Sequence, residues 1–99
     1  MVLNNIINRI KSINSNIKFV GSFDENNQKT GYWEEYYFNG NIKSKGFYFN
    51  GIKDGYWIFY YENGNIRYKG NFIYGYRDGY WGFYTIGGNL WYEANYKNN

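Results

Sequence analysis

The chain has 99 residues and a formal net charge of +3, from 11 Lys and Arg against 8 Asp and Glu, which fits one small domain with a thin core and a mild preference for acidic partners. It contains no Cys and no His, so disulfides, thiolate metal sites and the most usual general base are excluded, and we expect no enzyme activity, metal or cofactor. Aromatic residues make up 26% of the chain, and we expect these large, rigid side chains to supply the core.

The first 13 residues predict a short amphipathic helix. The apolar residues Leu3, Ile6, Ile7, Ile10 and Ile13 recur at helical spacing, with polar residues between them. We expect residues 1–13 to be helical only when packed, either as a cap over the sheet or in a partner's groove. No stretch is typical of a signal peptide or a membrane span, so we expect the protein in the cytoplasm of a bacterium, or of the host cell if a virus encodes it.

Residues 14–99 are predicted to form one repeat domain. Residues 31–54, 55–78 and 79–99 align without a gap at a period of 24 residues, and a half copy at 14–23 precedes them. A fixed period in this range indicates units that each form one supersecondary element and stack to complete a core.

The turn chemistry predicts that each unit is a β-hairpin. Asn39-Gly40, Asn63-Gly64 and Gly87-Gly88 are dipeptides that suit a two-residue type I′ turn. The connections at 50–55 and 74–79 predict looser turns between hairpins. The predicted fold is an all-β, single-layer antiparallel meander with strands at roughly 16–23, 31–38, 41–49, 55–62, 65–73, 79–86 and 89–96.

Counting outward from these turns predicts the register and one structural face. Next to the turns, the predicted pairs are Tyr37 with Ile42, Tyr61 with Ile66 and Thr85 with Leu90. Further out, each large indole faces a residue without a bulky side chain, as in the aromatic rescue of strand glycines: Trp33 with Gly46, Trp57 with Gly70 and Trp81 with Ala94. We expect this to be the structural face, and we expect it to need a lid.

The opposite face is the candidate binding surface. Its predicted pairs are Tyr36 with Lys43, Glu34 with Lys45, Tyr60 with Arg67, Ile58 with Lys69, Tyr84 with Trp91 and Gly82 with Glu93. Tyr, Trp and Arg are enriched at the energetically dominant positions of interfaces. The predicted partner-binding residues are Tyr36, Tyr60, Tyr84, Trp91, Lys43, Lys45, Arg67 and Lys69. The alternative is that cross-strand pairs of Tyr with Lys or Arg only stabilise the sheet.

The unit G-x-W-x-x-Y-x-x-x-G-x-(I/L) resembles the bacterial variant of the MORN repeat (membrane occupation and recognition nexus). In the first full copy the matching positions are Gly31, Trp33, Tyr36, Gly40, Ile42, Tyr48 and Gly51. The resemblance implies a curved single-layer sheet that binds proteins and, in some eukaryotic relatives, phospholipids. Bacterial members of this variant are often labelled antitoxin-like.

We therefore predict a non-enzymatic protein-binding module, an inhibitor or antitoxin that masks a functional surface of a partner such as a nuclease or toxin. Direct binding of single-stranded nucleic acid is an alternative, since bases can stack on Tyr while Lys and Arg follow the phosphates. Association with a membrane surface is another. The free edges of a single-layer sheet also make a homo-oligomer an open alternative.

Overall fold

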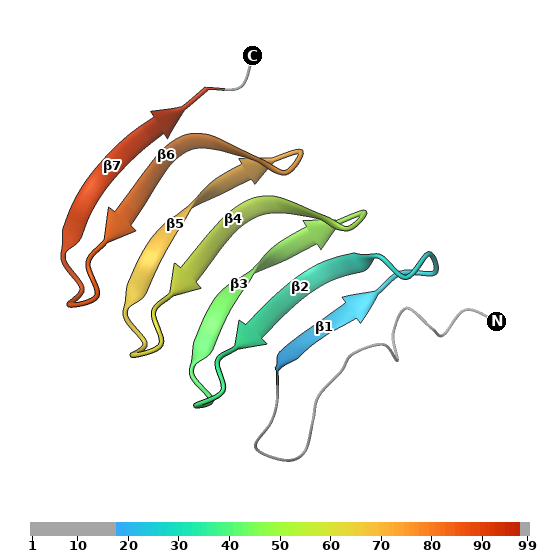
Figure 1. Ribbon diagram of the computed structural model, residues 1–99. Helices are drawn as coiled ribbons and strands as arrows, with labels where there is room; N and C mark the ends of the chain where they lie inside the picture. Colours follow the sequence, from blue (N-terminus) through green and yellow to red (C-terminus); the bar gives the residue numbers. More distant parts are fainter. Residues whose placement is uncertain (1–17, 98–99) are drawn as a thin grey trace.

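The computed structural model describes residues 18–97, which form one antiparallel sheet of seven strands in sequence order (Figure 1). The all-β, seven-strand prediction is confirmed, and the predicted helix at 1–13 lies outside the described residues. The strands are β1 (Phe19–Phe23), β2 (Lys29–Tyr36), β3 (Ile42–Phe49), β4 (Ile52–Tyr60), β5 (Ile66–Ile73), β6 (Tyr76–Tyr84) and β7 (Leu90–Tyr96).

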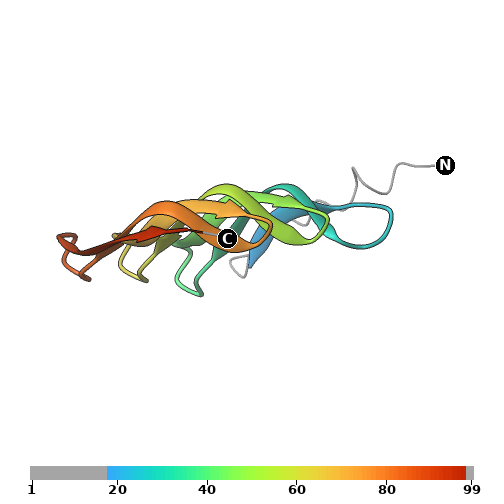
Figure 2. The same ribbon diagram turned by 90° about the horizontal axis from the view of Figure 1, so that it is seen from above.

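The sheet is a single curved layer. Its principal extents are 48 × 38 × 11 Å, and Figure 2 shows no second layer against either face of the described strands. Each face must therefore bury its apolar side chains against other side chains of the same face.

The loops inside the hairpins are not the predicted two-residue type I′ turns. In the first hairpin the N–H of Tyr37 donates to the carbonyl of Asn41 (2.8 Å) and the N–H of Gly40 donates to the carbonyl of Tyr37 (2.9 Å), which encloses three residues. Gly40 takes a positive φ of 93°, while the Oδ1 atom of Asn39 accepts the N–H of Asn41 (2.8 Å). This is the three-residue loop in which a type I turn is followed by a left-handed glycine.

The extra loop residue shifts the register next to the loop, and a bulge restores it. Tyr36 pairs with Ile42 and Glu35 pairs with Ser44, so the ladder skips Lys43. The second and third hairpins repeat the arrangement and skip Arg67 and Trp91. The pairs predicted next to the turns are therefore wrong, as are the pairs of Tyr36 with Lys43, Tyr60 with Arg67 and Tyr84 with Trp91.

Beyond the bulge the predicted register is correct. Trp33 pairs with Gly46, Trp57 with Gly70 and Trp81 with Ala94. The loop has one more residue than predicted, on the side of the first strand, and the bulge adds one residue to the second strand. The two extra residues offset each other, so the pairs beyond the bulge are the predicted ones.

The tight type I′ turns lie in the connections between hairpins, which were predicted to be looser. Asn50 and Gly51 have φ values of 52° and 79°, and Tyr74 and Gly75 have 52° and 81°. Positive φ at both central residues defines this turn. The turns start β4 and β6 at residues 52 and 76, which is earlier than predicted and adds Lys53 and Arg77 to the strands.

The core consists of three indoles, each seated on the strand that precedes its own hairpin. Trp33, Trp57 and Trp81 are 1%, 1% and 0% exposed. A Cβ added to Gly21, Gly46 or Gly70 would lie 2.2 Å from the ring of Trp33, Trp57 or Trp81, respectively. Each indole therefore packs on the glycine of the preceding unit, and not on the Gly or Ala with which it pairs inside its own hairpin. The predicted packing partner is wrong, although the predicted backbone register is right.

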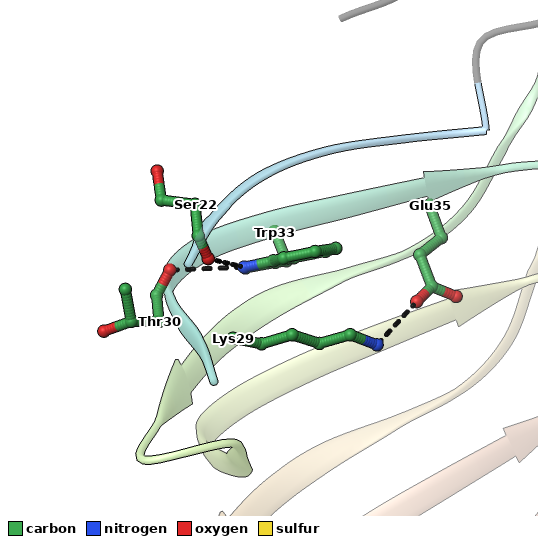
Figure 3. A network of polar contacts seen from close by, with 5 residues as sticks. All are labelled: Ser22, Lys29, Thr30, Trp33 and Glu35. Atoms are coloured by element: carbon green, nitrogen blue, oxygen red, sulfur yellow. Dashed lines mark hydrogen bonds and ion pairs between the residues drawn. The ribbon is translucent and has the colours of Figure 1, made fainter. Parts of the chain in front are cut away.

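Each indole N–H is also satisfied by the preceding strand. Trp33 donates to the carbonyl of Ser22 (3.0 Å), and Figure 3 shows a second acceptor, the carbonyl of Thr30 (3.2 Å). Trp57 donates to Phe47 (2.9 Å) and Trp81 to Asn71 (3.0 Å). In each case the accepting residue directly follows the glycine on which the indole packs. The pairing between neighbouring units shifts its register at this position. Neighbouring units are therefore joined by shape and by a hydrogen bond.

The other aromatic rings of this face surround the indoles. Phe19 stacks on Trp33 at 4.9 Å between centroids, Phe59 stacks on Trp57 at 5.7 Å, and Phe59 contacts Tyr68 at 4.7 Å. The expected lid is therefore not needed to bury the indoles. We call this surface the tryptophan face, and its rings are Phe19, Phe23, Trp33, Tyr48, Trp57, Phe59, Tyr68, Phe72, Trp81, Phe83, Tyr92 and Tyr96.

The hairpin loops form a second junction between units. The Tyr37 hydroxyl donates to the carbonyl of Tyr60 (2.6 Å), and the amides of Asn39 and Asn41 donate to the carbonyl of Glu62 (3.0 and 2.9 Å). Tyr61, Asn63 and Asn65 repeat these bonds one unit later. In the third unit Thr85 and Gly87 replace the tyrosine and the first asparagine, so that unit lacks these donors.

Candidate functional site

The face opposite the indoles presents two tyrosines on each of β2, β4 and β6. Successive side chains of a strand point to opposite faces, so the residues beside each tryptophan point away from the core. We call this surface the tyrosine face. It includes Tyr32, Glu34, Tyr36, Lys45, Phe47, Tyr56, Ile58, Tyr60, Lys69, Asn71, Tyr80, Gly82, Tyr84, Glu93 and Asn95.

A row of directly paired residues crosses the middle of the tyrosine face. Glu34 pairs with Lys45, Ile58 with Lys69 and Gly82 with Glu93, as predicted. Lys45 also pairs with Ile58, and Lys69 with Gly82. The row therefore has two lysines in its centre and one carboxylate at each end.

The carboxylates hold tyrosine rings in place. The Tyr32 hydroxyl donates to Oε2 of Glu34 (2.8 Å), and the Tyr36 hydroxyl donates to Oε1 of the same carboxylate. Burial, followed by the hydrogen bond to Glu34, raises the pKa of Tyr36 to about 12 and also raises the pKa of Tyr32. At the other end, the hydrogen bond of Tyr80 to Glu93 (3.0 Å) is the main cause that raises the pKa of Tyr80. These phenols therefore stay protonated donors at neutral pH.

Five of the eight predicted binding residues lie together on the tyrosine face. Tyr36, Tyr60 and Tyr84 are half-buried and form one row across β2, β4 and β6. Nζ of Lys45 lies 6.0 Å from the ring centroid of Tyr60, and Nζ of Lys69 lies 5.7 Å from that of Tyr84. The lysines thus cover tyrosines of the next unit, in the range of cation–π contacts.

The other three, Lys43, Arg67 and Trp91, lie at the bulges, away from this row. Nζ of Lys43 is 5.6 Å from the ring of Tyr37. The guanidinium carbon of Arg67 is 5.8 Å from the ring of Tyr68, which belongs to the tryptophan face. Trp91 contacts Tyr92 at 6.1 Å and is 74% exposed. A bulge interrupts the alternation of faces, and the count from an ideal turn missed it.

Four exposed rings of the tyrosine face were missed by the sequence prediction. Tyr32, Phe47, Tyr56 and Tyr80 are 43%, 55%, 55% and 52% exposed. Tyr32 and Phe47 contact each other at 5.4 Å, and both line a shallow hollow of about 210 Å³ with Tyr56, Ile58 and Lys45. The signal was present, because each of these tyrosines directly precedes a tryptophan and must point to the opposite face.

The described residues offer an aromatic surface for contact. Residues 18–97 hold no cluster of three or more side chains able to bind a metal ion. The same residues include no helix of the length and apolarity that a membrane span needs. A rigid, aromatic, gently curved surface with two central lysines can bind a partner of complementary shape and charge.

Comparison with known proteins identifies the repeat unit. The MORN repeat variant matches residues 29–50 and 53–74. No curated protein and no solved structure gives a significant match to the chain. MORN repeats are generally protein- or membrane-binding modules, and they are non-catalytic. Residues 29–50 and 53–74 thus match the MORN repeat variant as two tandem copies within a sheet of β-hairpin repeats.

Proposed function

We propose that the chain is a non-enzymatic protein-binding module that docks on another protein through its tyrosine face. The observation that carries this proposal is the exposed strip formed by Tyr32, Phe47, Tyr56 and Tyr80 beside Lys45 and Lys69. Exposed aromatic rings with little conformational freedom supply much of the energy at protein interfaces.

The strip is preorganised, which favours binding over simple solvation. Tyr32 is held by Glu34 and Tyr80 by Glu93, and Tyr32 packs on Phe47. Side chains already fixed in the free protein lose less conformational entropy on association. A sheet of 48 × 38 Å is also wide enough for an interface of ordinary size, about 800 Å² on each partner.

The charge pattern defines the partner surface that fits. Lys45 and Lys69 call for acidic groups opposite the centre of the face, while Glu34 and Glu93 call for donors at its two ends. An acidic active site bordered by basic residues has this pattern. We therefore propose an inhibitor or antitoxin that masks such a surface on a nuclease or toxin, in the cytoplasm of a bacterium or of a virus-infected host cell.

The test is affinity capture from the native host with two matched variants. Tyr56→Ser removes an exposed ring of the tyrosine face, and Tyr74→Ser removes an exposed ring from a type I′ turn outside this face. We expect Tyr56→Ser to lose the captured protein and Tyr74→Ser to retain it, with both variants melting as cooperatively as the parent. Equal capture by the two variants would contradict the choice of face.

Binding to a short single-stranded oligonucleotide or to lipid vesicles would overturn the proposal in a recognisable way. A nucleic-acid complex should weaken steeply between about 50 and 200 mM salt. A packed protein interface should respond less. Sedimentation with anionic vesicles, lost on adding salt, would identify a membrane surface as the target.

A further inference from the structure

The tryptophan face carries a row of cations, one for each unit. Lys29, Lys53 and Arg77 are spaced by 24 residues, and each lies over the tryptophan that follows it by four residues in the chain. The distances to the ring centroids are 5.0 Å for Lys29 Nζ, 5.5 Å for Lys53 Nζ and 5.2 Å for the guanidinium carbon of Arg77. The face that buries the core is therefore positively charged along its outside.

The stems of these side chains help to bury the indoles, and the charged groups remain outside the aromatic layer. Lys53 also lies over the rings of Tyr48 and Phe72, at 5.8 and 5.9 Å. Contact with a ring quadrupole positions a cation without neutralising it.

Lys29 and Lys53 differ in how their charges are compensated. Figure 3 shows Lys29 running beside the indole of Trp33 towards Glu35, at an Nζ to Oε2 distance of 3.7 Å. Within residues 18–97 no carboxylate lies within ion-pair distance of Lys53. An acidic group from outside the sheet would complete the environment of Lys53.

A hollow of about 660 Å³ lies between these two lysines. Tyr48, Phe23 and Phe72 line it together with Lys29 and Lys53, and none of its lining residues is acidic. The amide side chains of Asn27, Gln28 and Asn50 also border it. Burial, and then the nearby Glu35, raises the pKa of Tyr48 to about 12, which keeps its hydroxyl a donor. The site thus combines two cations, apolar walls and hydrogen-bonding groups.

We propose that this row binds an acidic segment of a partner protein that crosses the strands in a polyproline II conformation and carries a carboxylate at every third residue. Equivalent residues of neighbouring units lie two strands apart, about 9.5 Å. Three residues of a polyproline II chain also span about 9.3 Å and return the side chain to the same side, so successive carboxylates would meet successive cations while the residues between them cover the aromatic walls. This site lies opposite the tyrosine face and does not depend on the proposed function.

The test uses the Trp91→Phe chain, in which the remaining indoles, at 33, 57 and 81, lie beneath the cation row. The probe is a synthetic peptide with Glu at every third position in a Ser background, titrated while indole fluorescence is recorded. Two control peptides carry Gln in place of Glu, or the same Glu residues in one contiguous run. We expect saturable binding of the spaced Glu peptide, weaker binding of the contiguous peptide and none of the Gln peptide.

Lys53→Met keeps an apolar stem over Trp57 while removing the charge, so it separates binding from folding. We expect it to weaken the spaced peptide roughly tenfold, as the loss of one charged contact should. Lys97→Gln makes the same change of net charge at an exposed residue and should leave the affinity within about twofold.

Equal affinity for Lys53→Met and the parent, or for the two Glu peptides, would overturn the proposal. Tighter competition by a short oligothymidylate than by the spaced peptide would also overturn it, because phosphates would then be the preferred anions.

Discussion

The two faces of this sheet use the same strands for different purposes. On the tryptophan face the three indoles are at most 1% exposed, and each is seated on a glycine and bonded to a carbonyl of the preceding strand. On the tyrosine face Tyr32, Tyr56 and Tyr80 are 43–55% exposed, although each is the chain neighbour of one of those indoles. The comparison teaches that a single-layer sheet can bury a core on one side and leave aromatic rings exposed on the other side.

The two faces differ in which side chains cover the strands. A sheet usually buries one face against a second layer. Here the second layer is replaced by indoles seated on the glycine of the preceding unit and by the rings that surround them, and this explains why 26% of the chain is aromatic. The tyrosine face has no such interlocking rings, so its changes should affect binding more than folding.

We expect the largest difference in stability between substitutions of two chain neighbours that lie on opposite faces. Trp57→Ala removes an indole that is 1% exposed and should lower the free energy of unfolding by about 3–5 kcal/mol. Tyr56→Ala removes a ring that is 55% exposed and should cost less than about 1 kcal/mol. Urea unfolding of both variants measures the difference, and similar losses would show that the faces do not divide the work in this way.

The seat glycines should come next in effect. Gly70→Ala would place a Cβ 2.2 Å from the ring of Trp81, and we expect a loss of about 1–3 kcal/mol from overpacking. Ala94 stands at the equivalent position of β7, and the described residues place no later tryptophan there. Ala94→Gly should therefore cost only about 0.5–1 kcal/mol, through backbone entropy. Thermal unfolding of the two variants tests this, and an equal tolerance of both changes would contradict the seating of the indole.

The loop junctions should contribute less than the indoles. Asn63→Ala removes the donor to the carbonyl of Ile86 (3.0 Å) and the acceptor of the Asn65 N–H (2.9 Å). We expect a loss of about 1–2 kcal/mol in the free energy of unfolding, measured in urea.

Gly87 occupies the equivalent position of the third unit and serves as the control for this junction. Gly87→Asn should change stability by less than about 0.5 kcal/mol. A larger gain would show that the third unit also has an acceptor within reach.

We expect the smallest difference between the two faces in the pKa values of their tyrosines. The pKa of Tyr36 and that of Tyr48 are both raised to about 12, in each case first by burial and then by Glu34 or Glu35, respectively. Below about pH 10 both the folded and the unfolded chain keep these protons, so neither group makes stability depend on pH. Between about pH 10 and 12 the unfolded chain loses them first, and the free energy of unfolding should fall as pH rises.

Glu34→Gln separates the two tyrosines. It should lower the pKa of Tyr36 towards 10 and leave that of Tyr48 unchanged, which phenolate absorbance, with Tyr48→Phe as the reference variant, can resolve. An equal shift of both groups would mean that Glu34 does not act locally.

Much of the fold was predictable because the repeat encodes it. The period of 24 residues, the positions of the hairpins and the pairing of each Trp with Gly or Ala follow from the sequence alone. The type of turn did not, because Asn39-Gly40 suits both a two-residue loop and a three-residue loop. The second form is stabilised by bonds of Asn39 and Asn41 to Glu62, which lies 21 or more residues away in the chain and has no local signal.

The candidate site was predictable to the extent that alternation of faces holds. Tyr36, Lys45 and their equivalents follow from that rule, and Tyr32 and Tyr56 would have followed from it too. Lys43 and Arg67 could not be placed, because the bulge that turns them away compensates a loop whose length was unknown.

Fluorescence quenching of the Trp91→Phe chain tests most directly whether one face of a single layer buries its own core. Removing Trp91, which is 74% exposed, leaves the three seated indoles as the reporters. We predict that acrylamide quenches them weakly in the folded protein and strongly in urea. Quenching in the folded protein as strong as in urea would contradict the account.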